Sequence, residues 1–279
     1  MSEKTPLSIP LENAPLIELI AEVRWSSAPL QGSESIQTSG RGPTFITAPT
    51  NQLDEFFMRF GGAVHSAGYS ETERLVPPGF PFMEHQVVYR FRSRNESGTK
   101  SLYQVGPGLF SANAVPPYES WAQFEPIVRK GVEAIIGARS QSEKDAPFLA
   151  TNLRYIDAFG AALTGGRDIT KFAEEVLGIQ VGLPKAITQH LVQGGVPSPV
   201  LHFQIPMVNG ALMTVGIGQG IANGQPAIMM DTSVSTTVEI APTVESVMAA
   251  FNSAHTAIHQ TFEPLMKPIA HLMPPKRSS

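Results

Sequence analysis

Three side chains near the C-terminus have the residue types and the spacing that metal sites use. His255, His259 and Glu263 follow one another at four-residue steps in the stretch FNSAHTAIHQTFEPLM. Side chains four residues apart share one helical face, and histidine pairs at this spacing ligate zinc. A zinc protease needs HExxH with the glutamate as general base, and Thr256 stands where that glutamate is required. This excludes the protease and leaves a plain His/His/Glu metal site as an alternative.

The second interpretation, which we favour, is that these histidines belong to the architecture of the helix. On a helical wheel of 100° per residue, Phe251, Ile258 and Phe262 point in one direction, and the three polar residues turn roughly 40°, 80° and 120° away from it. We therefore expect His255 to be partly buried and hydrogen-bonded to a strand or loop beneath the helix, and Glu263 to be exposed. On this interpretation the protein uses no metal and no cofactor.

Arginine side chains on predicted strands form a second group with chemical potential: Arg24, Arg90, Arg92 and Arg154. The guanidinium group suits bidentate recognition of carboxylates or phosphates. If Arg24 and Arg154 lie on equivalent first strands of two halves, they would face a common cleft. The alternative is that the arginines pair with Glu22, Asp157 or nearby acids on a solvated face of a sheet.

A glycine-rich segment supplies the last candidates. Gly106-Pro107-Gly108 separates two strand-like runs, and Ser111 and Asn113 follow on alternate positions. We expect a kink or bulge that bends the strand, and a glycine-lined strand beside these two residues is also a candidate ligand contact. Ser111 lacks the GxSxG elbow of a serine nucleophile. The glycines of GIGQG, residues 216–220, precede another strand and not a helix, which argues against a phosphate loop.

Alternating and three/four-residue apolar patterns predict the elements that position these side chains. The first half has a strand at 16–25, a loop or weak strand at 26–42, and a helix at 51–66. A proline-rich edge segment at 75–83, a hairpin across Asn95–Gly98 and a helix at 118–139 follow, with a kink or restart expected at Pro126.

The second half repeats this order. It has a strand at 148–159, a helix near 168–177, three strands (VLHFQIPM, ALMTVGIGQG and PAIMMDTSVST) and a helix at 244–266 with Thr243 as its N-cap. FEPI at 124–127 and FEPL at 262–265 occupy the same place in the two final helices. The sequence therefore predicts an α+β protein of two related halves, 1–145 and 146–279, in one compact unit. Antiparallel sheets would be covered on one face by long helices.

The composition limits the classes of function. The chain has 279 residues, a net charge of −4 and only 16% charged residues, which favours a contact surface poor in charge and makes nucleic-acid binding unlikely. It has no cysteine, so disulfides and Cys-ligated zinc are excluded. With no apolar run of bilayer length and no secretory signal at the N-terminus, we expect a soluble cytoplasmic protein with no membrane partner.

The chain also resembles a sporadically distributed prokaryotic family. The segments LIELIAEVRW, YQVGPGLFSAN with Tyr118 and Trp121, LRYIDAF and AHTAIHQTFEPLM follow the order of the family's PLxEVxxEIRF, LQxGPxxxSxN with YxxWxxF, LRYIN and AHxxIxxxFE motifs. The chain departs from the family at Gly108 and Asp157, where Asn is common, and at Pro264. The family supplies no established activity, and its patchy distribution implies accessory or conflict-system genes.

These observations favour a non-enzymatic protein-binding factor, such as a toxin-neutralising immunity protein or a component of a bacterial defence or conflict module. Its partner would be another protein encoded by a neighbouring gene, and homo-oligomer formation stays open. The residues expected to bind are Arg24, Arg90, Arg92, Arg154, Ser111, Asn113 and His255. The alternative is a small-ligand (nucleotide or carboxylate) binding protein or enzyme, with a pocket between sheet and helices lined by Arg24, Arg154 and His255.

Overall fold

A single antiparallel sheet of nine strands organises the chain in the computed structural model, which describes residues 11–27, 45–46, 51–93, 100–118, 120–141, 143–193 and 195–275. The strand order is β3-β5-β6-β7-β1-β8-β11-β10-β9. The strands are β1 (Leu16–Arg24), β3 (Glu71–Arg74), β5 (Tyr89–Arg92), β6 (Lys100–Gly106), β7 (Leu109–Val115), β8 (Ala150–Phe159), β9 (Leu201–Pro206), β10 (Ala211–Ala222) and β11 (Gln225–Thr236). A separate short pair joins β2 (Phe45–Ile46) to β4 (Phe82–Met83).

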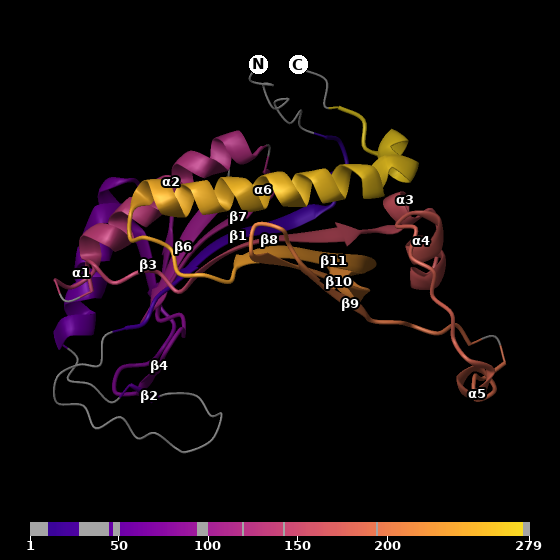
Figure 1. The fold of residues 1–279 in the computed structure, drawn as a ribbon, viewed down its shortest axis with the longest axis horizontal. Helices are drawn as coiled ribbons and strands as arrows, with labels where there is room; N and C mark the ends of the chain where they lie inside the picture. The colour runs from indigo at the N-terminus through magenta and orange to yellow at the C-terminus, as the bar shows by residue number, and fades with distance from the viewer. Residues whose placement is uncertain are drawn as a thin grey trace.

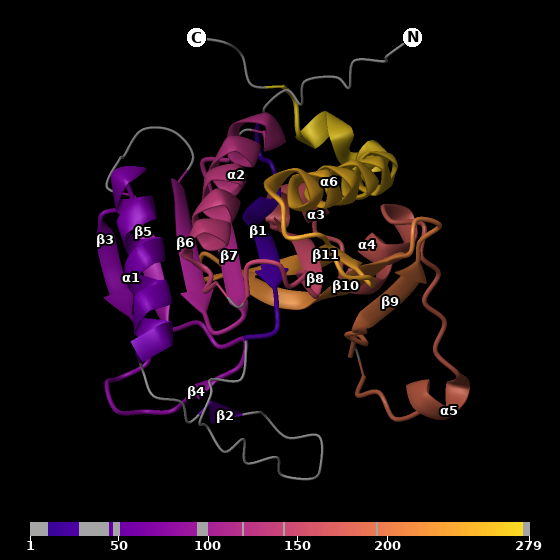
Figure 2. The ribbon, with the colours of Figure 1, turned by 60° about the vertical axis from the view of Figure 1, so that its left-hand side comes forward.

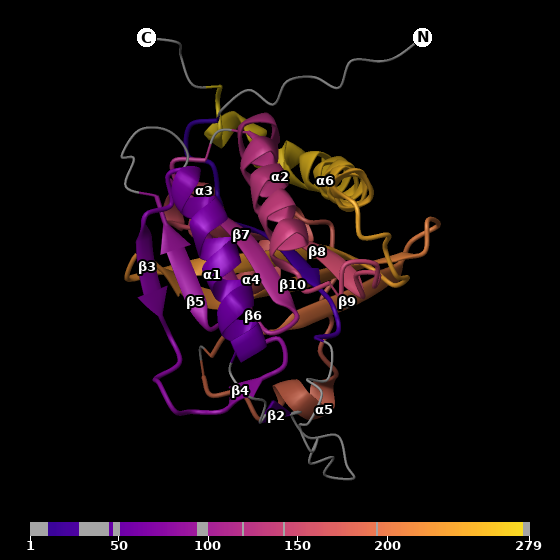
Figure 3. The same ribbon diagram turned by 90° about the vertical axis from the view of Figure 1, so that its left-hand side faces the viewer.

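The long helices lie together on one side of this sheet (Figures 1 and 3). They are α1 (Asn51–Ser66), α2 (Trp121–Ala138) and α6 (Val244–Met266). Shorter helices are α3 (Ala161–Thr164), α4 (Ile169–Glu175), α5 (Lys185–Thr188) and the 3-10 helix η1 (Lys267–Leu272). None of the helices in the described part of the chain has the length and apolarity that spanning a bilayer requires.

The core lies between the helices and one face of the sheet. On β1, Leu19, Ala21 and Val23 are fully buried, and the residues between them are only partly buried. This alternation arises because successive strand side chains point to opposite faces. From the helices, Phe124 of α2 and Phe251 of α6 are fully buried against this face. The helix side of the sheet is therefore the apolar side.

Arg139, just after α2, is a buried cation beside the end of β1 and the start of β8. It is 1% exposed, its guanidinium lies 4.7 Å from the ring of Phe148 and 5.9 Å from that of Trp25, and its Nη2 donates to the Ala146 carbonyl at 2.8 Å. Burial lowers its pKa, and the charge of Glu143 opposes this shift. The end of β1, the start of β8 and the chain between α2 and β8 thus meet around one side chain.

The predicted positions of most elements agree with the structure. Strands β1, β8, β9, β10 and β11 and helices α1, α4 and α6 lie where the patterns indicate, and Thr243 Oγ1 accepts the N–H of Ser246 as the predicted N-cap. The segment 216–220 is part of strand β10, as expected. The predicted turn at Asn95–Gly98 and most of the loop at 26–42 lie outside the described residues.

One local prediction was wrong, and of the kink or restart expected at Pro126 the restart is contradicted. The segment Gly106-Pro107-Gly108 is not a bulge inside one strand, because Gly106 pairs with Leu109 and the two residues between them form the turn of the β6–β7 hairpin. Gly108 has φ +67° there, and a Cβ on it would lie 2.3 Å from the Trp25 carbonyl oxygen. Helix α2 does not restart at Pro126 but continues from Trp121 to Ala138.

Candidate partner-binding face

Six of the seven predicted binding residues lie on the side of the sheet opposite the long helices. Residues paired across antiparallel strands share a face of the sheet. Ser111 pairs with Glu22, and both Asn113 and Arg154 pair with Ile20. Ser111, Asn113 and Arg154 therefore lie on the face that Ile20 and Glu22 occupy. We call this side the open face and define it by the polar residues Glu18, Glu22, Arg24, Arg90, Arg92, Ser111, Asn113, Arg154 and Asp231.

Ser111 and Asn113 of β7 begin a hydrogen-bonded network on the open face. The Ser111 hydroxyl donates to Asn113 Oδ1 at 2.8 Å, and Asn113 Nδ2 donates to Glu18 Oε1 of β1 at 2.9 Å. Ser111 and Asn113 are 4% and 6% exposed, so these bonds satisfy groups that are costly to bury unpaired. An amide oxygen is not a general base, so this arrangement orders the Ser111 hydroxyl without activating it as a nucleophile.

Arg154 of β8 connects this network to β11, because its charge interacts with that of Glu18 on β1 and its guanidinium is paired with Asp231 on β11. Its Nε donates to Asp231 Oδ1 at 2.8 Å, and its Nη2 contacts Asp231 Oδ2, which makes a bidentate pair. This hydrogen bonding raises the pKa of Arg154, and the negative charges of Asp231, Glu18 and Glu22 act in the same direction against burial. One cation on β8 is therefore held among three carboxylates on its two neighbouring strands, β1 and β11.

The remaining arginines are also paired. Arg24 Nε donates to Glu22 Oε1 at 2.6 Å, and Nη1 of both Arg90 and Arg92 donates to Glu73 Oε2, at 3.3 and 2.9 Å. Arg24 and Arg154 face the same side of the sheet but have separate partners. The alternative stated above, pairing with acids on a solvated face, therefore describes these arginines, except that Asp157 is not one of the partners.

His255 lies on the other side of the sheet and takes no part in the open face. Its Nδ1 is 2.8 Å from the Tyr155 hydroxyl on β8, and its ring stacks on Trp121 of α2 with centroids 5.1 Å apart. Burial and, to a lesser degree, the charge of His259 lower the pKa of His255 to about 4. The hydrogen bond to a strand beneath the helix agrees with the prediction. A pocket lined by Arg24, Arg154 and His255 together is wrong, because the sheet separates the histidine from the arginines.

The metal alternative lacks the geometry it needs. His259 Nε2 approaches Glu263 Oε1 at 3.5 Å, while the rings of His255 and His259 are tilted with centroids 5.9 Å apart. Within the described ranges, no group of three or more His, Asp or Glu side chains is close enough to hold a metal ion. Glu263 is exposed, as its place on the helical wheel indicated.

The layer around His255 contains two further groups that were not among the predicted binding residues. Asp157 of β8 is 3% exposed on the helix side of the sheet, and burial together with the charge of Asp231 raises its pKa to about 7. Tyr118 is hydrogen-bonded to Tyr155, and burial raises its pKa. In the sequence, Asp157 alternates in step with Leu153 and Phe159 along the strand, so the period-two pattern already indicated the apolar side, and this signal was missed.

Asp231 and Glu18, the two carboxylates at the ends of the network, were also missed. Asp231 did carry a signal, because it is the only charged residue between Lys185 and Glu239. A lone charge in a long uncharged stretch needs a partner if it is half-buried, and the strand order supplies Arg154. Glu18 has no comparable signal, since its role depends on Asn113, which is 95 residues away.

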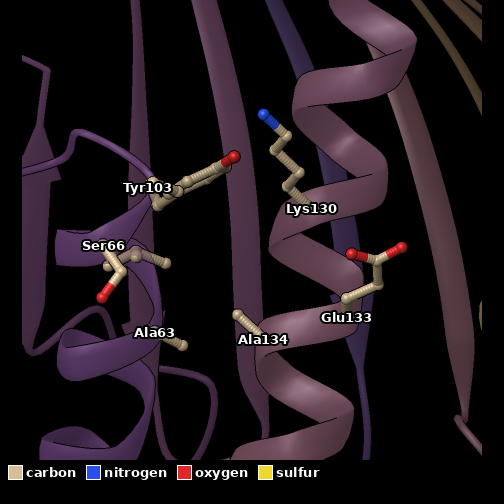
Figure 4. Close-up of a pocket in the computed structure, with 8 residues that line it drawn as sticks. Ala63, Ser66, Tyr103, Lys130, Glu133 and Ala134 are labelled. Carbon is tan, nitrogen blue, oxygen red and sulfur yellow. The ribbon is translucent and has the colours of Figure 1, made fainter.

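A groove of about 490 Å³ lies between α1 and α2 (Figure 4). Small side chains line it on both helices, with the charged Lys130 and Glu133 on α2 and the ring of Tyr103 from β6. The Tyr103 hydroxyl donates to the Ile127 carbonyl at 2.7 Å, and burial raises the pKa of this tyrosine. The groove contains none of the predicted binding residues.

No family model, no curated protein and no solved structure matches this chain. The site must therefore be interpreted from its own geometry.

Proposed function

We propose that this chain is a non-enzymatic protein-binding factor whose partner contacts the open face. The observation that carries the proposal is the partly exposed Arg154–Asp231 pair beside Glu18, which the buried Ser111 and Asn113 hold in place, in an arrangement that extends over four adjacent strands. Side chains that are already held in one geometry lose little entropy when a partner binds. Alternating fixed charges also select a partner of complementary pattern.

The same geometry argues against two other uses of this face. Each arginine named on the open face has a carboxylate contact, so a phosphate or carboxylate ligand would have to displace an internal partner. The Ser111 hydroxyl points to an amide oxygen, which does not take up a proton. Contact with a large complementary surface is the use that leaves these pairs intact.

The class of factor follows from the family resemblance and belongs to the same proposal. A toxin-neutralising immunity protein or a component of a bacterial defence or conflict module binds the product of a neighbouring gene. Such a partner would meet the protein in the cytoplasm, where a chain without cysteine is at no disadvantage.

Co-purification with the product of the adjacent gene tests this proposal, with one variant on the open face and one matched control. Arg24→Glu reverses a charge on the open face, where the Arg24 side chain is 50% exposed and paired with Glu22. Arg59→Glu makes the same change on α1, where the Arg59 side chain is 49% exposed and paired with Glu55. We expect Arg24→Glu to weaken binding at least tenfold and Arg59→Glu to leave it unchanged.

Failure of the wild-type protein to bind its neighbour's product would contradict the class of factor. Equal binding by Arg24→Glu and wild type would contradict the assignment of the open face. Equal melting temperatures of the two variants without partner would establish that a binding difference does not come from unfolding.

One observation favours a second function, a small-ligand binding protein or enzyme. The layer between β8, α2 and α6 brings together a neutral His255, the Tyr155 hydroxyl and the carboxyl of Asp157, whose pKa is raised to about 7. Perturbed groups of this kind gather at functional sites. A thermal-shift screen of the protein with nucleotides, carboxylates and divalent metals tests this function. Stabilisation that His255→Asn abolishes would support it, and an unchanged melting temperature with all ligands would count against it.

We also propose that residues 1–145 and 146–279 are two related halves with long helices over one shared face. The support is the strand order. From the edge of the sheet to its central strand, the order β5-β6-β7-β1 of the first half corresponds to the order β9-β10-β11-β8 of the second half. In each set the first strand of the half pairs with its last strand, and a long helix, α2 or α6, follows. Because β1 and β8 pair with each other at the centre, neither half is expected to fold alone. Expression of residues 146–279 tests this: a cooperative thermal transition would contradict it.

A further inference from the structure

The chain from α5 to β10 forms the least charged part of the sequence. Residues 186–230 contain no Asp, Glu, Lys or Arg. Exposed large apolar side chains concentrate there as well. In the described ranges they include Ile187, Leu191, Val192, Val196, Val200, Phe203, Ile205, Val208 and Ile221. Exposed apolar side chains in a contiguous stretch mark a contact surface.

Strand β9 of this stretch lies at one edge of the sheet, and α5 lies away from the long helices. β9 is the last strand in the sheet order, so within the described residues its second edge has no partner strand. In Figures 1 and 2, α5 lies between α4 and β9 along the chain and is separated in space from the long helices. An unprotected edge strand next to exposed apolar residues is a site for further strand pairing, and proteins usually blunt such edges with charges.

The hairpin geometry determines which backbone groups β9 presents. Met207 N donates to the Ala211 carbonyl at 2.8 Å, so residue 207 faces β10. Along an antiparallel strand, the N–H and C=O groups of successive residues point alternately to the two edges of the strand. Phe203 and Ile205 therefore also direct their N–H and C=O groups to β10. His202 and Gln204 therefore direct their N–H and C=O groups to the free edge.

The pattern of apolar and polar side chains along β9 is symmetric about its central residue. In the sequence Leu-His-Phe-Gln-Ile, residues 201–205, apolar and polar positions alternate symmetrically about Phe203. When two such strands pair antiparallel about this residue, Leu201 meets Ile205 of the other copy, and His202 meets Gln204. The outward-facing residues then form the hydrogen-bonded pairs, and the two Phe203 rings form the closer, non-hydrogen-bonded pair.

We propose that β9 pairs antiparallel with β9 of a second copy of this chain, centred on Phe203, to form a two-fold symmetric dimer with one continuous sheet. A two-fold axis requires a self-complementary surface, and this edge is self-complementary in both its hydrogen-bond groups and its side chains. A second copy brings no like-charge repulsion to the axis, because the stretch is uncharged. Val196 and Val200 are exposed directly before β9 in the chain, so a second copy paired with β9 can also cover apolar side chains next to the strand.

The length of the edge agrees with a dimer rather than an open array. Pro199 and Pro206 bound it, and proline has no N–H to continue a ladder. Strand pairing over six residues buries less surface than a stable dimer needs, which is about 1,200 Å² or more. The area must therefore be completed by the apolar residues before β9, which is why Val196 and Val200 belong to the same interface.

Analytical ultracentrifugation of the full-length protein across micromolar concentrations tests the proposal. We expect a species of twice the 30.0 kDa chain mass. Gln204→Pro removes an N–H that faces the free edge and none that bonds β10, so it should give a folded monomer. Phe203→Lys should also give a monomer by adding two like charges at the axis. Val208→Lys is the matched control, since this exposed turn residue lies in the same uncharged stretch beyond the edge and should stay dimeric.

Amide hydrogen exchange distinguishes this dimer from other forms of self-association. The amides of His202 and Gln204 should exchange more slowly as the protein concentration rises, while those of Phe203 and Ile205 should not change. A wild-type protein that is monomeric at about 100 μM would overturn the proposal. So would dimers of a folded Gln204→Pro variant, or protection confined to other strands. None of these results depends on the open face or on a partner protein.

Discussion

Asp157→Asn provides the most direct test of how the helix side of the sheet is built. Asp157 is 3% exposed in the layer between β8 and the helices, and burial and the charge of Asp231 raise its pKa from 3.8 to about 7. The folded protein therefore holds a proton that the unfolded chain releases above pH 4. Asparagine has the shape of the protonated carboxyl and does not ionise.

The direction of the pH effect follows from proton linkage. Because the pKa of Asp157 is higher in the folded state, its contribution to stability is fully present below pH 3.8 and is lost as the pH rises through 7. At about 1.4 kcal/mol per pKa unit, the ionised form is disfavoured by up to about 4 kcal/mol in the folded protein. Asp157→Asn should accordingly be about 2–4 kcal/mol more stable than wild type at pH 8.5 and close to wild type at pH 4.

His255 has the opposite dependence and must be separated from this effect. Its pKa falls from 6.5 to about 4 in the folded protein, so its contribution is present above pH 6.5 and is lost as the pH falls through 4. Between pH 4 and 6.5 the two groups offset each other in wild type. In Asp157→Asn the histidine acts alone, so the stability of that variant should rise with pH over this window. The double variant with His255→Asn should be nearly flat.

Urea denaturation followed by circular dichroism at half-unit pH steps from 4 to 8.5 measures these curves. Asp145→Asn is the control, because Asp145 is an exposed acid in the turn before β8 and should leave the curve unchanged. A constant difference between Asp157→Asn and wild type at all pH values would refute the reasoning. A less stable variant at pH 8.5 would refute it as well, since it would mean that the ionised carboxylate is satisfied in the fold.

The remaining predictions concern stability and are measured by the same urea denaturation at pH 7. Phe251→Ala, at a fully buried position of α6, should lower the free energy of unfolding by about 3–5 kcal/mol through cavity formation, and a loss below 1 kcal/mol would contradict its place in the core. Gly108→Ala should cost about 2 kcal/mol or more, because its Cβ would lie 2.3 Å from the Trp25 carbonyl at φ +67°; Gly79→Ala, with a positive φ but open space, should cost less. Arg139→Ala should cost roughly 2–4 kcal/mol by removing the contact with Phe148 and the hydrogen bond to Ala146. An unchanged stability of Arg139→Ala would mean that this cation does not join the end of β1 to the chain between α2 and β8.

Patterns among neighbouring residues in the sequence were enough to predict much of the local structure. Period-two alternation in LIELIAEVR and three/four spacing around Phe124 and Phe251 depend only on near neighbours, so β1, α2 and α6 were predictable. The hairpin at Gly106-Pro107-Gly108 was not, because the same glycines serve a bulge or a turn. The choice was made by the pairing of β6 with β7 and by the close approach of the Trp25 backbone to Gly108.

The candidate site shows the same division. Residue type identified Arg154, Ser111 and Asn113 as groups able to bind, and helical spacing gave the partial burial of His255 and the exposure of Glu263. Which face each strand residue occupies relative to its neighbours depends on register. Register put the arginines on the open face and His255 on the other side, and it joined Asn113 to Glu18 and Arg154 to Asp231. These partners are 95 and 77 residues apart, and no local pattern encodes contacts of that range. The sequence thus determined which side chains were available, and the pairing of distant strands decided which of them meet.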